Sequence, residues 1–133
     1  MNNNQREFEL WFDQAKYDLH AAEGSIDHGD YEWACFQAQQ SAEKALKAFL
    51  FLKGERAIIT HSVYRLIKMC LNYDSEFKTI INAKELDEYY IPTRYPNGLP
   101  DEVPHRFYNL EDAEKCVNYA KSVISMIERL GRQ

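Results

Sequence analysis

Basic side chains that could hold a phosphate recur through the middle of this chain. Lys44 and Lys47 stand three residues apart, and His61 and Arg94 follow further along. Lysine and arginine bind phosphate through charge-assisted hydrogen bonds, and imidazole titrates near neutral pH, so that it can act as a general acid or base. Brought together, these four side chains would form an anion site. Each also has an ordinary structural interpretation, as a solvated or salt-bridged residue near the surface.

Two further features bear on such a site. Glu43 precedes Lys44, and Arg94 could either bond the Glu43 carboxylate, which would pin its loop, or grip a phosphate in a bidentate manner. Tyr95 follows Arg94, and with Tyr89 and Tyr90 it could stack a nucleobase or simply pack the loop. Both interpretations stay open at this point.

The first half of the chain predicts a helical hairpin. Residues 5–28 and 31–53 each carry apolar side chains at alternating spacings of three and four, which is the period of an amphipathic helix. Only Gly29 and Asp30 separate them; the glycine predicts a helix stop and Asp30 an N-cap. The stripes are Phe8, Phe12, Ala15, Leu19, Ala22 and Ile26, then Tyr31, Cys35, Ala38, Ala42, Ala45, Phe49 and Leu52.

The second of these helices is apolar on two faces, because Trp33, Phe36 and Phe51 project opposite its main stripe. A helix of this kind is usually buried on two sides, either by helices of its own chain or by a second copy. Alternatively, the polar band of Glu43, Lys44 and Lys47 faces a groove that takes an anionic ligand. A homodimer across this region would satisfy both interpretations.

The second half predicts shorter helices and one long loop. Thr60 is expected to cap a helix over 61–73, and a weaker pattern over 75–89 suggests a helix that is broken in two. All four prolines fall within the irregular segment 90–108. Asn109 then caps the last helix, with Asp112 in a near capping-box position, and Gly131 ends it. No stretch alternates with period two, so we predict one all-α domain over 1–133, an antiparallel up-and-down bundle of four or five helices.

Composition narrows the classes of function. The net charge of −5 argues against coating duplex DNA. Cysteines at 35, 70 and 116 and four scattered histidines show no ligand spacing, so we predict buried thiols, no metal and no cofactor. No leader-like or membrane-spanning run is visible, which predicts a cytoplasmic protein without membrane contact.

Four motifs resemble the HEPN family, the nucleotide-binding domain of higher eukaryotes and prokaryotes. Residues 34–50 read ACFQAQQSAEKALKAFL, similar to the signature second helix of that family. Trp11, Ala15, Asp18, Leu19 and Ala22 are similar to its first helix, while Thr60-His61 with Leu66 and Thr93-Arg94-Tyr95-Pro96 match later segments. The resemblance implies a helical bundle related to the helical domain of kanamycin nucleotidyltransferase-like enzymes. It also implies a homodimer, and a module that works beside a separate small nucleotidyltransferase protein, often as a toxin–antitoxin system.

Some members of the family are metal-independent ribonucleases with an Arg followed by a His after four to six residues. Arg56 and His61 have that spacing, but Ala57 stands where a polar residue is expected. Three hypotheses therefore remain. The preferred one is a module that binds nucleotide or RNA phosphate through Glu43, Lys44, Lys47, His61, Arg94 and Tyr95. The alternatives are a ribonuclease that uses Arg56 and His61, and a purely structural adaptor.

Overall fold

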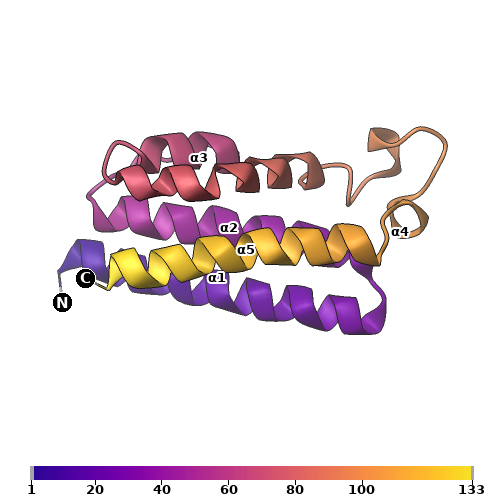
Figure 1. Cartoon of the computed structure of the whole chain (residues 1–133), viewed down its shortest axis with the longest axis horizontal. Coiled ribbons are helices and arrows are strands. Elements are labelled where there is room, and N and C mark those ends of the chain that lie inside the picture. The colour runs from indigo at the N-terminus through magenta and orange to yellow at the C-terminus, as the bar shows by residue number, and fades with distance from the viewer. Residues whose placement is uncertain (1, 133) are drawn as a thin grey trace.

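The computed structural model describes residues 2–132, and they fold as an antiparallel helical bundle with no strand (Figure 1). Three long helices and two shorter ones make the body of the bundle, and two brief helical turns lie in the segment before the last helix. In chain order the elements are α1 (Asn3–His28), α2 (Tyr31–Leu52), α3 (Val63–Cys70), η1 (Ser75–Tyr89), η2 (Pro96–Gly98), α4 (Pro104–Phe107) and α5 (Leu110–Gly131). The predicted all-α class and antiparallel topology are confirmed.

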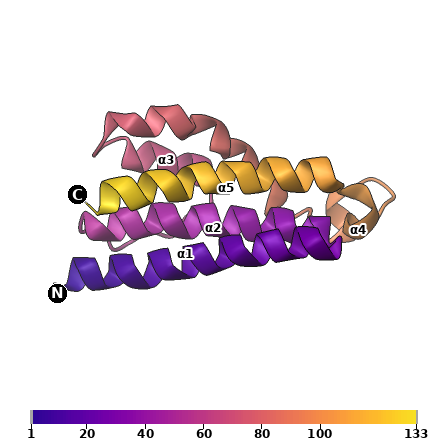
Figure 2. The ribbon, with the colours of Figure 1, turned by 60° about the horizontal axis from the view of Figure 1, so that its bottom comes forward.

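Helix α2 is the centre of the bundle, because it contacts α1, α3, η1, α4 and α5 (Figure 2). Its alanines at 34, 38, 42 and 45 are fully buried, and such small side chains let neighbouring helices approach closely. The second apolar face is partly covered from within the chain: Phe51 packs against Trp11 of α1, with ring centroids 5.1 Å apart, whereas Trp33 remains 46% exposed.

The ends of the long helices follow the expected cap chemistry, with one exception. Asn109 and Asp112 form a reciprocal capping box at the start of α5, as predicted. Gly29 has φ of 79°, a left-handed conformation that ends α1 and that glycine adopts without steric penalty. Asp30 does occupy the N-cap position of α2, but its side chain makes no cap hydrogen bond.

The predicted cap of α3 was wrong by two residues. Ser62, not Thr60, is the N-cap: its hydroxyl accepts from the Arg65 amide at 3.1 Å, so the helix begins at Val63. Thr60 instead accepts from the Ser62 amide. The start of α3 is fixed by a residue outside residues 60–70, because the Asp87 carboxylate accepts from the Ser62 hydroxyl at 2.8 Å and from the Val63 amide at 2.6 Å.

The segment from 75 to 89 is helical as predicted, and the segment from 90 to 108 is more ordered than predicted. Residues 75–89 form a 3₁₀ helix with a kink at Ile80, where φ is −112° and ψ is 16°, which agrees with the weak and divided pattern. The stretch predicted as irregular, 90–108, contains η2 and α4, each with a proline in its first turn, where the missing amide hydrogen is not needed. Within residues 2–132 no helix is long and apolar enough to cross a lipid bilayer.

Candidate functional site

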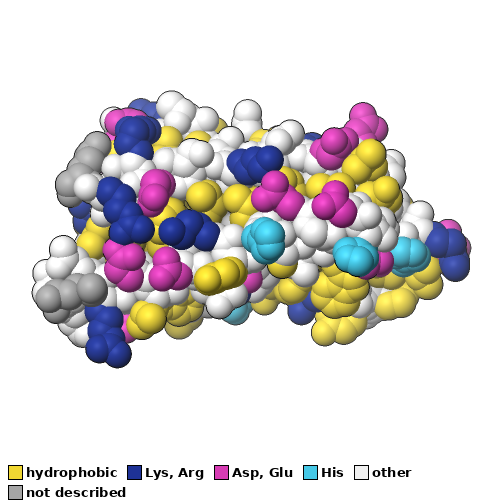
Figure 3. Space-filling model, turned by 90° about the horizontal axis from the view of Figure 1, so that it is seen from below, with side chains coloured by type: hydrophobic (Ala, Val, Ile, Leu, Met, Phe, Trp, Pro, Cys, Tyr) yellow, Lys and Arg dark blue, Asp and Glu magenta, His cyan; other side chains and the backbone are white. Residues whose placement is uncertain are grey.

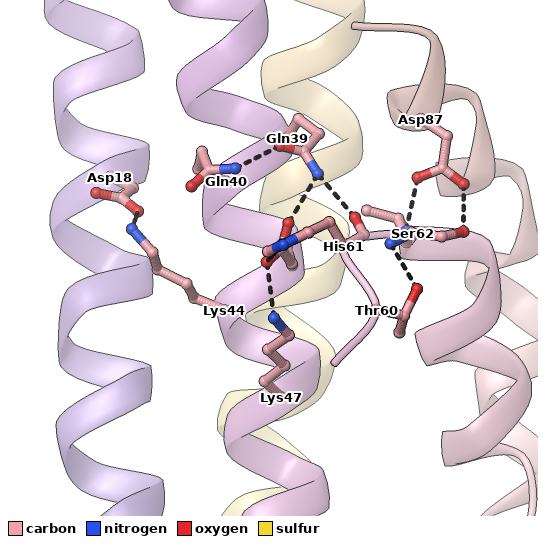
Figure 4. A network of polar contacts seen from close by, with 11 residues as sticks. Asp18, Gln39, Gln40, Lys44, Lys47, Thr60, His61, Ser62 and Asp87 are labelled. Carbon is pink, nitrogen blue, oxygen red and sulfur yellow. Dashed lines mark hydrogen bonds and ion pairs between the residues drawn. The ribbon is translucent and has the colours of Figure 1, made fainter. Parts of the chain in front are cut away.

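A buried carboxylate on α2 organises the candidate site. Glu43 is only 4% exposed, yet its carboxylate is contacted by three side chains, Gln39, Lys47 and His61, which Figure 4 labels. Oε2 lies 2.9 Å from Lys47 Nζ and 3.1 Å from His61 Nδ1, and Oε1 accepts from Gln39 Nε2 at 3.1 Å. An ionised carboxylate is an acceptor only, so with Glu43 ionised the Nδ1 of His61 is the ring nitrogen that carries the proton.

The two lysines of the predicted anion site are both paired with carboxylates of the chain. Lys47 is 5% exposed and is held by Glu43 one turn earlier on the same helix. Lys44 reaches across to α1 and pairs with Asp18 at 2.6 Å (Figure 4). Lys44 therefore joins α2 to α1, and Lys47 is paired within α2. Each ammonium group is neutralised within the fold, so neither is a free cation for a phosphate.

His61 lies in the extended segment before α3, and its ring faces outward. Its side chain is 57% exposed, its ring stacks on Tyr90 with centroids 5.4 Å apart, and its carbonyl accepts from Gln39 at 3.2 Å. With Nδ1 directed at Glu43, Nε2 is the nitrogen left to accept a proton or a hydrogen bond from a ligand. The prediction that His61 lies in the first turn of α3 was wrong, because the helix begins at Val63, but the His61 side chain is accessible to solvent as predicted.

Arg94 lies flat over an aromatic surface and does not bond Glu43. Its guanidinium carbon is 4.4 Å from the ring centroid of Phe36 and 4.8 Å from that of Tyr90, and it is 5.3 Å from that of Tyr95. Its Nε donates to the Tyr90 carbonyl at 2.9 Å. Among residues 2–132 its two terminal nitrogens make no hydrogen bond or ion pair with a carboxylate. Of the two alternatives left open by the sequence, the Arg94–Glu43 bond is not formed: the Glu43 oxygens accept from Lys47, Gln39 and His61 instead.

Arg56 does not join this group. Its guanidinium donates to the carbonyls of Phe51 and Glu55 and to the Asn4 side chain, which ties the end of α2 to the start of α1. Phe51 lies eight residues beyond Glu43, which corresponds to about 12 Å along the helix axis at 1.5 Å per residue. Arg56 and His61 have the sequence spacing of the ribonuclease motif, but their side chains do not meet in one site.

The residues that do converge are Phe36, His61, Tyr90, Arg94 and Tyr95, here called the His61–Arg94 face. Phe36 and Tyr90 are stacked with centroids 6.2 Å apart, so the face is a continuous surface of rings with one cation on it. Trp33 extends it, edge-on to Phe36 at 6.1 Å. The sequence analysis did not identify Gln39, whose amide contacts both Glu43 and the His61 carbonyl. Its position four residues before Glu43, on the same side of α2, could have indicated this contact.

The face of the molecule that is seen from below carries side chains of both charges (Figure 3). In the space-filling view from below, basic and acidic side chains alternate over the surface, hydrophobic side chains gather along its lower right edge, and no continuous basic patch is seen there (Figure 3). Trp33, Ile91 and Tyr95 are 46%, 47% and 49% exposed. The His61–Arg94 face therefore offers exposed aromatic rings and one guanidinium to a ligand, and not the broad basic surface that binds duplex phosphates.

Comparison with known proteins adds a family and relatives. Residues 8–130 match the model of the HEPN domain. The chain is 29% identical over 128 residues to a Methanocaldococcus jannaschii protein named "Putative toxin MJ1304", covering 90% of this chain and 84% of that one. It resembles the crystal structure of TT1696 from Thermus thermophilus, with 37% identity, a TM-score of 0.85, and 97% and 98% of the two chains covered. It also resembles ST0689, described as an archaeal HEPN homologue, with 33% identity, a TM-score of 0.76, and 92% and 96% covered.

Proposed function

This chain belongs to the HEPN domain family, and we propose that its His61–Arg94 face binds a nucleotide or single-stranded RNA. The base stacks against the exposed rings, and the phosphate meets the guanidinium of Arg94 and Nε2 of His61. The bound species is single-stranded or mononucleotide, because stacking needs an unpaired base and the net charge of −5 opposes broad duplex binding.

The observation that carries this proposal is the state of Arg94. The chain neutralises Lys44 and Lys47 with its own carboxylates, and it uses Arg56 to join two helices. Arg94 instead lies on Phe36 and Tyr90 with its terminal nitrogens directed to no carboxylate of residues 2–132. Arginine held on an aromatic surface keeps its bidentate donors for a phosphate, and aromatic rings beside it offer stacking surfaces.

The biological setting that we propose is a two-protein, toxin–antitoxin-like module. Support comes from the family and from the relative whose name describes a toxin. In this setting the chain acts with a separate small nucleotidyltransferase and forms a homodimer. Trp33 and Ile91 beside the site supply exposed apolar surface for such contacts, since aromatic and aliphatic side chains dominate the cores of interfaces.

A binding titration tests the nucleotide proposal. A fluorescently labelled single-stranded RNA oligonucleotide is titrated with the full chain at low salt, and ATP and GTP are titrated by calorimetry. Arg94→Ala should weaken RNA binding by roughly 5- to 150-fold, the range that corresponds to 1–3 kcal/mol for a stacking and phosphate contact. Arg65→Ala, which removes the same charge from an exposed position on α3, is the matched control and should bind like the native chain.

Two outcomes would refute the binding proposal. The first is equal loss in Arg65→Ala and Arg94→Ala, which would indicate only a general charge effect. The second is the absence of heat and of anisotropy change at millimolar nucleotide and micromolar RNA, which would leave the adaptor hypothesis.

A second candidate, ribonuclease activity, is favoured by the Glu43–His61 contact. A buried carboxylate that holds Nδ1 of an exposed histidine at 3.1 Å orients the ring and leaves Nε2 to take a proton from a ribose 2′-hydroxyl. Arg94, not Arg56, would then face the phosphate. RNA incubated with the chain without metal distinguishes the two: cleavage that is lost in His61→Ala and kept in His20→Ala would establish catalysis, whereas intact RNA supports binding alone.

A further inference from the structure

Three potential metal ligands meet at the N-terminal end of α2. Asp30, Glu32 and His105 each offer one ligand atom, and these atoms all lie within 4.8 Å of one another. Glu32 and His105 are 73 positions apart in the chain, so no sequence spacing reveals the group. The absence of such spacing is the reason that no metal was predicted from sequence.

The fold holds each of the three side chains in place. Asp30 is the N-cap residue of α2, and Glu32 lies in the first turn of that helix. His105 follows Pro104, which is buried and begins the short helix α4, and α4 packs against α2. Two ligands therefore come from a rigid helix start, and the third comes from a separate segment that closes over it.

Glu32 is the informative member, because it is a buried carboxylate without a basic Lys or Arg partner. It is 6% exposed, and within residues 2–132 its side chain is hydrogen-bonded only to His105, with Nδ1 at 2.8 Å from Oε2 and 3.2 Å from Oε1. The other buried glutamate of α2, Glu43, has Lys47 beside it. A buried carboxylate needs compensation for its lost hydration, and a cation is the strongest source of it.

Asp30 adds a second carboxylate that the fold does not use. The carboxylate of Asp30 makes neither the cap hydrogen bond nor any other hydrogen bond or ion pair with residues 2–132. A half-buried Asp at an N-cap normally accepts from the second or third amide of the helix. Here its oxygen lies instead toward the Glu32–His105 pair.

We propose that Asp30, Glu32 and His105 bind a divalent transition-metal ion of the Zn²⁺ type, with water completing the coordination. One imidazole and two carboxylates are a donor set that suits such ions. Ligand atoms at about 2.0–2.2 Å from a metal lie no more than about 4.4 Å apart, and the three atoms here lie within 4.8 Å of one another. The His105 side chain is 63% exposed, so small adjustments of its ring are possible. The bound ion would fasten α4 to α2.

Calorimetry with Zn²⁺ on the full chain tests this site, with Co²⁺ as a spectroscopic probe. We expect one ion per chain and visible absorption from bound Co²⁺. Asp30→Asn keeps a good N-cap residue, and His105→Ala alters a mostly exposed side chain, so both variants should fold. Each should weaken Zn²⁺ binding by at least about tenfold, since even outer-shell partners of a metal matter by that factor. His20→Ala, on the exposed side of α1, should bind like the native chain.

Limited proteolysis supplies a readout that does not depend on affinity. Zn²⁺ should slow cleavage within residues 99–109 of the native chain and should not do so in His105→Ala. The proposal fails if Asp30→Asn and His105→Ala bind Zn²⁺ as tightly as the native chain. It also fails if His20→Ala loses binding equally, or if no ion binds at a concentration near that of the protein.

Discussion

Replacement of Glu43 by leucine should destabilise the fold more than replacement of Lys47 by methionine, although the two residues form one ion pair. Glu43 accepts three hydrogen bonds, from Lys47, His61 and Gln39. Glu43→Leu removes all three and leaves the Lys47 ammonium, whose side chain is 6% exposed, without a counter-charge. Lys47→Met removes one donor and leaves Glu43 with the other two.

The structure sets the approximate size of both effects. Two unit charges 2.9 Å apart attract by about 6 kcal/mol at an effective dielectric constant of 20, and lost hydration offsets much of this attraction. Removal of one partner from a buried pair costs about 3–5 kcal/mol, which we expect for Glu43→Leu. Lys47→Met should cost about 1.5–3 kcal/mol, the value of one hydrogen bond to a charged group. The double variant buries no unpaired charge from this pair, so it should be more stable than Glu43→Leu alone.

Urea unfolding followed by circular dichroism measures the four members of this double-mutant cycle. A coupling free energy of about 2 kcal/mol or more is expected, and the exposed pair of Asp13 and Lys16, at 3.6 Å, is the control and should give less than about 1 kcal/mol. If the double variant loses as much stability as the two single variants added together, the buried pair is not the interaction that fixes this part of α2, and the reasoning is refuted.

Two further predictions concern packing and pH. A Cβ at Gly131 would clash with Cζ of the buried Phe8, so Gly131→Ala should lower stability by about 1–3 kcal/mol. Gly24 lies in the interior of α1, and a Cβ there would meet nothing within 4 Å, so Gly24→Ala should raise stability by about 0.5–1 kcal/mol. Thermal unfolding that moves both midpoints in the same direction would contradict this reasoning. Burial raises the pKa of Tyr108 from 10.0 to about 12, so the folded chain keeps a proton that the unfolded chain loses. The contribution of the Tyr108 proton to the free energy of unfolding is complete below pH 10 and is lost as the pH rises through 12. Tyr108→Phe should therefore reduce the fall in the urea midpoint at alkaline pH. An unchanged slope would exclude Tyr108 as the cause of that fall.

The helices could be predicted from sequence because their determinants are local. Apolar side chains at spacings of three and four define α1, α2 and α5, and the confinement of proline to 92–104 keeps those helices unbroken. The cap of α3 could not be predicted in the same way. Thr60 and Ser62 are both competent caps, and the choice between them depends on Asp87, which is brought to the Ser62 hydroxyl by tertiary structure.

The site was predicted less well, for two different physical reasons. Glu43 and Lys47 have the spacing of four that favours an ion pair on a helix, so their mutual neutralisation was accessible to sequence reasoning and was overlooked. The packing of Arg94 on aromatic rings could not be predicted from the sequence, because the rings come from separate segments, Phe36 from α2 and Tyr90 from the residues after η1. His61 and Arg94 were both named as candidates from the sequence, but their partners in the fold depend on how three separate segments meet.

The outer side of α2 explains why those segments meet where they do. Glu32 and Glu43 are eleven residues apart, which is close to three full turns, so both carboxylates lie on one side of the helix about 16 Å apart. Each is buried and holds a histidine from a distant segment, His105 before α5 and His61 before α3. Phe36, one turn after Glu32, carries Arg94 on the same side. Because the two carboxylates fix the segments that flank Arg94, the geometry of the ligand face depends on buried carboxylates. Glu43 has Lys47 as a counter-ion and Gln39 as a further donor, whereas Glu32 has neither a lysine nor a side-chain amide as a partner among residues 2–132.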